Sequence, residues 1–309
     1  MTATITEPVR LTPQRMEAFL LRSLPWLLRQ QLPTGELLCY QKEPGRDAVP
    51  YPYPLFSALA SEALTCLDPR SAYFSPRLHD LIPATRRRVC TRVIITIRLR
   101  IRYYLAAQED PGGFWRLHGR SGFSAPDLAT TACAAALLLE ERYDTPARHA
   151  GAVRRLMAEY PQDALGGVFG LRLLSLAGEA NQVSLQAARE SICNENDDPV
   201  PVAWAMDQAE HDGHIVIGRE IRDREPTAMP SAQSRLRKAF AVSSWLHREH
   251  RGLELGRGIE ALANDPVPPW LWEHDRLRHH MASPAATLAI ILRTMAQALA
   301  DEDIGRSTC

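Results

Sequence analysis

The sequence predicts an all-α protein in which pairs of helices stack on one another. Three observations support this: apolar residues recur at three- and four-residue steps, proline begins several of these runs, and the arrangement repeats along the chain. Of the 309 residues, 45% are hydrophobic and 23% are charged, which is typical of a globular protein. We expect a single domain at residues 13–300, between flexible ends at 1–12 and 301–309.

Composition excludes several classes of protein. The 36 basic and 36 acidic residues cancel, so there is no general attraction to nucleic acid. No stretch approaches the roughly 20 apolar residues of a membrane-spanning helix, and the N-terminus lacks the apolar core of a signal peptide. The six cysteines are scattered and predict reduced thiols that fill the core. We expect a cytoplasmic protein without a transmembrane segment, and we allow for peripheral contact with a membrane.

Four helices are predicted to begin at prolines, which suit the first turn because their missing N–H is not needed there. In each run small residues follow the proline, so neighbouring helices can approach closely. Ser124 can cap the second helix, with Asp127 in its first turn. The starts are spaced 72, 73 and 85 residues apart along the chain, at Pro54, Pro126, Pro199 and Pro284.

A second repeated feature is a turn that ends a helix. In YYLAAQEDPGGFW a helical run ends at Gln108, passes through glycine and restarts at Trp115. PWLLRQQLPTGEL repeats it with Gln31 and Gly35, and WAMDQAEHDGHI is a weaker third copy. Pairing Gln31 with Gln108 gives an interval of 77 residues. We expect the glutamine to hydrogen-bond free backbone groups of the turn and the glycine to supply a positive φ.

One segment gives conflicting signals. Residues 92–104 are rich in β-branched side chains and alternate arginine with apolar residues, which is the periodicity of a strand. We nevertheless predict a helix here, because the glutamine turn follows directly. Seven arginines gather in this part of the chain, either as an exposed helix face or as a site for a diphosphate or lipid headgroup: Arg86, Arg87, Arg88, Arg92, Arg98, Arg100 and Arg102.

The turn pattern resembles the QW motif of squalene–hopene and related terpene cyclases, most closely in the copy that ends at Trp115. The run SAPDLATTACAAALLLE also resembles the helix start that carries the family's Asp-x-Asp-Asp-Thr-Ala acid motif. The resemblance implies a single α/α toroid of the terpenoid cyclase and prenyltransferase type, with an apolar cavity inside an inner ring of helices. It further implies protonation-initiated cyclisation or isomerisation of a prenyl or polycyclic hydrophobic substrate.

The acid motif departs from the family at its central position. Aligning Thr131 and Ala132 with the family's Thr-Ala places Ala129 where the family has its proton-donating aspartate. We therefore expect Asp127, or the pair Asp197 and Asp198, to act as the acid. The competing interpretation of Asp127 is an ordinary first-turn aspartate favoured by the helix dipole, and that of Asp197 and Asp198 is helix capping. Aromatic side chains would bind the substrate and stabilise cations: Tyr51, Tyr53, Trp204, Trp270 and Trp272.

Two other functions stay open on the sequence. A non-catalytic toroid that binds an isoprenoid or a partner protein is favoured by Ala129, and a carbohydrate-active α/α barrel would need two carboxylates beside a glycosidic bond. A metal is not expected, because Asp197 and Asp198 lack a third carboxylate for magnesium. His247 and His250 likewise lack the spacing of a zinc-binding helix. No cofactor and no nucleic-acid partner are predicted.

Overall fold

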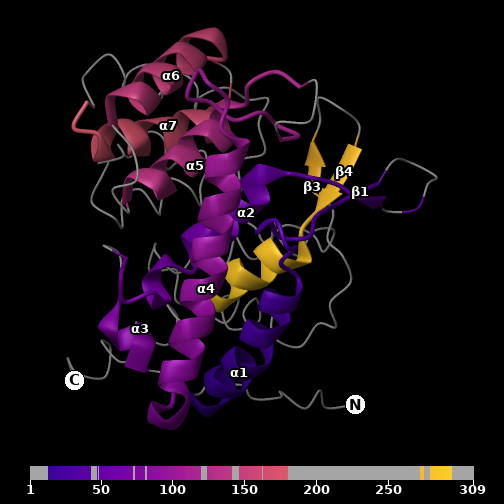
Figure 1. Ribbon diagram of the computed structural model, residues 1–309, viewed down its shortest axis with the longest axis vertical. Coiled ribbons are helices and arrows are strands. Elements are labelled where there is room, and N and C mark those ends of the chain that lie inside the picture. The colour runs from indigo at the N-terminus through magenta and orange to yellow at the C-terminus, as the bar shows by residue number, and fades with distance from the viewer. Residues whose placement is uncertain are drawn as a thin grey trace, which may run out of the picture.

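Helix predominates in the computed structural model, which confirms the expected class. The described residues are 13–42, 47, 49–71, 74–80, 82–119, 124–140, 146–161, 163–179, 272–274 and 279–293 (Figure 1). The helices are α1 (Pro13–Arg29), α2 (Pro54–Ala63), α3 (Pro76–Asp80), α4 (Ala84–Gln108), α5 (Leu128–Glu140), α6 (Pro146–Glu159) and α7 (Ala164–Leu176), with a 3-10 turn η1 (Thr65–Leu67) and a further helix at 284–293.

The helix α4 resolves the conflicting segment in favour of helix. It runs without a break through residues 92–104, and its buried side chains recur at three- and four-residue steps: Cys90, Ile94, Ile97, Ile101 and Leu105. The apparent strand alternation arises because arginines occupy both the buried and the exposed side of this helix. Arg98 and Arg102 are buried, whereas Arg86, Arg88, Arg92 and Arg100 are exposed. The arginine cluster is therefore two sets of side chains with different surroundings.

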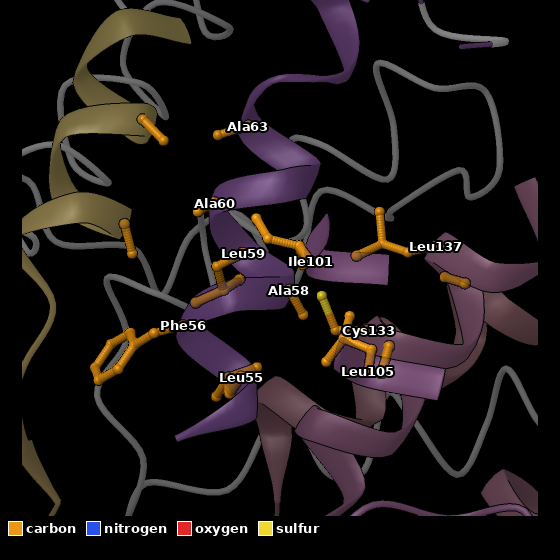
Figure 2. Packing of buried hydrophobic residues seen from close by; sticks show 14 of the residues in the cluster. Leu55, Phe56, Ala58, Leu59, Ala60, Ala63, Ile101, Leu105, Cys133 and Leu137 are labelled. Atoms are coloured by element: carbon orange, nitrogen blue, oxygen red, sulfur yellow. The ribbon is translucent and has the colours of Figure 1, made fainter. Parts of the chain in front are cut away.

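The core forms where α5 packs against both α2 and α7. All ten residues of α2 are buried, and its small side chains let the neighbouring helices approach closely. Figure 2 shows part of this packing, with apolar side chains from three helices in one cluster: Leu59 and Ala63 of α2, Ile101 and Leu105 of α4, and Cys133 and Leu137 of α5. Four cysteines of the described residues are free thiols and buried, as expected of core residues: Cys39, Cys66, Cys90 and Cys133.

A small antiparallel sheet was not predicted. Its strands β1 (Tyr40–Lys42), β2 (Val49–Pro50), β3 (Trp272–His274) and β4 (His279–Ala282) lie in the order β2-β1-β4-β3. The pairing of β1 with β4 joins two parts of the chain that are far apart in the sequence (Figure 1). Strands of two to four residues are too short to show an alternating pattern, so the purely helical prediction missed them.

Two turns have the same backbone hydrogen bonds and define a structural repeat. In the first turn (residues 31–37), the Gly35 N–H donates to Leu32 O at 2.9 Å, and the Leu32 N–H donates to Glu36 O at 2.8 Å. In the second turn (residues 109–115), the corresponding bonds join Gly113 to Asp110 and Asp110 to Phe114, both at 2.9 Å. Both glycines have positive φ, 99° and 78°.

The repeat corrects one predicted correspondence. Equivalent residues of the two turns lie 78 positions apart, so Gln31 corresponds to Glu109 and not to Gln108. The Gln108 side chain lies instead beside Gly119, where a Cβ would meet its Oε1 at 2.9 Å. Gln108 therefore lies one residue further from its turn than Gln31 does from the first turn.

Each turn donates a backbone hydrogen bond to a side-chain hydroxyl of the following helix. The Leu37 N–H donates to Ser57 Oγ at 3.0 Å, and the Trp115 N–H donates to Thr131 Oγ1 at 3.0 Å. Ser57 and Thr131 are both the fourth residue of their helices, α2 and α5. The chain therefore contains two equivalent units of helix, glycine turn and buried helix.

Candidate functional site

Four helix starts lie close together at one end of the core. Tyr53 precedes α2, Asp163 caps α7, and Asp127 and Ser283 precede α5 and the helix at 284–293. Burial and the charges of Asp127 and Asp163 raise the pKa of the Tyr53 phenol, Cys39 lies near that phenol, and Ser283 Oγ donates to Leu38 O, next to Cys39, at 3.5 Å. We call these four residues the helix-start rim.

The helices behind the rim run in the same direction. Glu62, the ninth residue of α2, forms an ion pair with Arg172, the ninth residue of α7, at 2.8 Å. Arg293, the tenth residue of the helix at 284–293, lies 3.6 Å from the same carboxylate and donates to Glu62 O at 3.2 Å. Helices that meet both at their starts and about two and a half turns further along are parallel. This arrangement gathers several helix N-termini at the rim.

Glu62, Arg172 and Arg293 form a cluster of buried charges, which we call the Glu62 cluster. The sequence analysis did not predict it. Burial alone would raise the pKa of Glu62, but Arg172 and Arg293 outweigh burial and hold the pKa below its ordinary value. Asp68 is similarly paired, with Arg98 at 2.6 Å and Arg70 at 3.0 Å, and its pKa is also lowered despite burial. These pairs tie α4, α7 and the helix at 284–293 to the end of α2 and the residues after it.

Asp127 is a helix cap. Its Oδ2 accepts hydrogen bonds from the Thr130 N–H at 2.8 Å and the Thr130 hydroxyl at 2.5 Å. The backbone N–H of Asp127 in turn donates to Trp115 O at 2.9 Å, so the second turn positions this residue. The helix therefore begins at Leu128, two residues after Pro126. Asp127 is therefore the cap in place of the predicted Ser124, whose Oγ accepts from the His118 N–H at 3.2 Å.

Tyr53 lies near Asp127 and Asp163, and Tyr51 lies beside His118. Tyr53 is 3% exposed, and burial, followed by the charges of Asp127 and Asp163, raises the pKa of its phenol well above the ordinary value. Its ring lies 4.9 Å from that of Phe56 and 6.3 Å from that of His118, while Tyr51 meets His118 edge-on at 5.0 Å. The phenol of Tyr53 therefore stays protonated and can donate a hydrogen bond.

Most of the other predicted site residues lie in a different part of the chain. Asp197, Asp198, Trp204 and Trp270 lie outside the described residues, as do the predicted helix at Pro199, the third turn, and His247 and His250. Trp272 lies in β3, where its backbone pairs with Met281 of β4. Within the described part of the chain, no group of three or more potential metal-ligating side chains is found.

Two residues of the site were not predicted. Asp163 caps α7 by accepting a hydrogen bond from the Gly166 N–H at 2.8 Å, in the same role as Asp127 in α5. An aspartate before the apolar run ALGGVFGLRLLSL was a usable signal for this helix start. His118 had no such signal, because the contact of its ring with Tyr51 and Tyr53 depends on the tertiary fold.

Comparisons with known proteins do not assign a class. The sequence matches no protein-family model and no curated protein. The helices in the described ranges include none with the length and apolar character needed to cross a membrane.

Proposed function

We propose that this chain is an α/α toroid that binds a hydrophobic, isoprenoid-type molecule at the helix-start rim, and that Asp127 holds the helix rather than donating a proton. The observation that carries the proposal is the pair of equivalent units, with matching hydrogen bonds in both glycine turns. Repeated helix pairs that cannot bury an apolar face alone stack on one another. Parallel buried helices behind a common rim agree with the inner ring of such a toroid.

The rim has the chemistry to orient a molecule that is apolar with one polar end. Tyr53 offers a protonated phenol next to the aromatic ring of Phe56 and the ring of His118. Apolar side chains of α2 and α5 continue behind it, including Leu55 and Leu128. A prenyl alcohol or a similar isoprenoid can place its hydroxyl against the Tyr53 phenol and its hydrocarbon against these helices.

The bonds of Asp127 support a role in holding the helix. Its Oδ2 accepts two hydrogen bonds from Thr130, one from the backbone N–H and one from the hydroxyl, both at the start of α5. Ala129, at the position of the family's proton donor, is buried and has only a methyl group. A protein that binds the molecule without cyclising it therefore agrees with the capping role of Asp127 and with alanine at position 129.

A terpene cyclase-like enzyme is the second candidate, and Asp163 is the observation that favours it. Asp127 and Asp163 both act on Tyr53, so two carboxylates belong to the same rim. In such an enzyme one of these carboxylates would act as the acid. In that mechanism Asp163 takes the place of the missing family aspartate, and the apolar surroundings protect a developing cation from water.

Mass spectrometry of lipid extracted from the purified protein tests the binding proposal, followed by titration with the linear prenyl alcohol geranylgeraniol. Tyr53→Phe keeps the ring and removes the phenol, so we expect affinity to fall by about fivefold to tenfold, the value of one hydrogen bond. Tyr104→Phe is the matched control, because Tyr104 is also 3% exposed but lies on α4 near Glu36. No extracted isoprenoid and no binding of the alcohol would overturn the proposal.

Product analysis separates the two candidates. The protein is incubated with linear prenyl alcohols, diphosphates and epoxides, alongside Asp127→Asn and Asp163→Asn. Asparagine at position 127 can still cap the helix, so the fold should survive. We expect bound, unchanged substrate in all three proteins. A cyclised product that disappears in Asp163→Asn would instead establish the enzyme.

A further inference from the structure

The outward face of α4 has an unusual charge pattern. Over its 25 residues, Ala84–Gln108, the helix contains seven arginines and not one aspartate or glutamate. Arg98 and Arg102 are buried, and Arg87 forms an ion pair with Asp80 at 3.3 Å. The four remaining arginines are exposed: Arg86, Arg88, Arg92 and Arg100.

These four arginines flank a line of less polar side chains. At about 100° per residue, side chains seven positions apart lie nearly in line along a helix, which places Val89, Thr96 and Tyr103 in one row. Arg88 and Arg92 then fall on one side of the row, and Arg86 and Arg100 fall on the other. Val89 is 61% exposed and Tyr103 is 62% exposed, and they are two of the three large apolar side chains that are strongly exposed in the described residues.

This face differs from an ordinary solvated helix face. Exposed helices commonly intersperse charges of both signs, and like charges four residues apart, such as Arg88 and Arg92, repel each other. In the described part of the chain, none of the four exposed arginines has an ion-pair partner. The chain as a whole has zero net charge, so the positive charge is concentrated locally on this face.

We propose that this arginine face of α4 (Arg86, Arg88, Val89, Arg92, Thr96, Arg100 and Tyr103) docks on an anionic lipid bilayer. Guanidinium groups on both sides of the row can reach lipid phosphates, while Val89 and Tyr103 enter the boundary between headgroups and acyl chains. Tyrosine favours this boundary because one end of its side chain is apolar and the other is polar. The inference goes beyond the proposed function and does not depend on it.

A membrane surface fits this face better than an acidic protein. The exposed arginines follow one another at irregular steps of two, four and eight residues. A sheet of lipid phosphates accepts any such spacing, whereas a folded acidic partner must match it. The two exposed apolar side chains in the middle of the arginines also have a use at a bilayer that simple charge pairing does not give them.

Sedimentation with vesicles tests the proposal, using the full chain. Vesicles of equal parts phosphatidylcholine and phosphatidylserine are compared with vesicles of phosphatidylcholine alone. We expect binding only to the anionic vesicles, with an affinity that falls steeply as salt is added. Arg92→Gln with Arg100→Gln should weaken binding about 25-fold, because each arginine near an anionic surface contributes about a factor of five. Tyr103→Ser should weaken it several-fold without changing the salt dependence.

The matched control removes two exposed arginines from another helix, by Arg154→Gln with Arg155→Gln on α6. Equal losses in the two double variants, or equal binding of wild type to both kinds of vesicle, would overturn the proposal. Binding to the acidic polypeptide polyglutamate without binding to vesicles would assign the face to a protein partner and likewise overturn it. The salt titration of the wild type decides the question even if a variant does not fold.

Discussion

The first turn and the second turn have the same backbone hydrogen bonds but different side chains brace them. Gln31, 8% exposed, donates from Nε2 to Gly35 O at 2.8 Å and to Ile97 O of α4 at 3.0 Å. At the equivalent position Glu109 accepts from Arg148 of α6 at 2.7 Å and lies 3.3 Å from the ring nitrogen of His149. One brace is a neutral amide on backbone carbonyls, and the other is a carboxylate with cationic and imidazole partners.

The aromatic position differs as well. Trp115 is fully buried and its indole Nε1 donates to Leu105 O at 2.7 Å, near the end of α4. Leu37, the residue equivalent to Trp115, has no donor in its side chain. Leu27 is equivalent to Leu105, and its carbonyl oxygen accepts the Gln30 N–H instead of an indole N–H. The comparison teaches that the glycine and the backbone bonds define this turn, while the bracing side chains can be exchanged between units. Motif searches that depend on glutamine and tryptophan therefore miss equivalent copies.

Exchanging the side chains of Gln31 and Glu109, by Gln31→Glu and by Glu109→Gln, should give the largest difference in the free energy of unfolding. Gln31→Glu would place a buried carboxylate against the carbonyls of Gly35 and Ile97, so we expect a loss of about 3–5 kcal/mol in the free energy of unfolding. The loss should shrink as the pH falls, because a protonated carboxyl can donate to one of those carbonyls. Glu109→Gln should cost only about 0.5–1 kcal/mol, since Arg148 is 44% exposed to solvent. Urea denaturation measures both, and similar losses would contradict the comparison.

Alanine at the two turn glycines should separate steric conflict from backbone strain. Both positions have positive φ, which costs a residue with a Cβ about 1–2 kcal/mol. At Gly35 the Cβ would also lie 2.2 Å from Arg100 O, whereas at Gly113 the nearest atom is Arg148 Cγ at 3.1 Å. We expect Gly35→Ala to cost about 3 kcal/mol or more and Gly113→Ala about 1–2 kcal/mol. Equal shifts of the thermal midpoint in the two variants would show that the Arg100 carbonyl of α4 moves away from the new Cβ at position 35.

Removing the indole tests the aromatic brace of the second turn. Trp115→Phe deprives Leu105 O of its donor and leaves a gap in the core, so we expect a loss of about 2 kcal/mol. Trp26→Phe in the first unit is the control, because Trp26 is only partly buried and should cost less than about 1 kcal/mol. Guanidinium denaturation followed by circular dichroism compares the two variants. A larger loss for Trp26→Phe would refute the assigned role of Trp115.

Removing the hydroxyls of Thr131 and Ser57, which accept hydrogen bonds from the turns, should give the smallest difference in the free energy of unfolding. Thr131 accepts from the Trp115 N–H and also donates to Trp115 O at 3.2 Å, whereas Ser57 accepts from the Leu37 N–H. We expect Thr131→Val to cost about 2 kcal/mol and Ser57→Ala about 1 kcal/mol. Hydrogen exchange of the Trp115 and Leu37 amides provides the local measurement. Unchanged protection of both amides would mean that the backbone bonds alone hold the turns.

Local patterns predicted much of the helical structure and part of the site. Pro54 and Pro284 begin helices as expected, and Gln31 bonds the turn that follows it. Asp127 was predicted in the first turn of its helix and lies one residue before that helix, where it is the cap. The pairing of Gln31 with Gln108 was wrong, because the turn glycines Gly35 and Gly113, 78 residues apart, set the correspondence and the glutamines do not.

The sequence by itself determined the helices, the glycine turns and the caps, since each depends on residues a few positions apart. The tertiary structure decided which arginines of α4 are buried, that Glu62 meets Arg172 and Arg293, and that Tyr53 lies beside Asp127 and Asp163. It also decided the pairing of β1 with β4. Such contacts join residues far apart along the chain, and they depend on how whole helices pack.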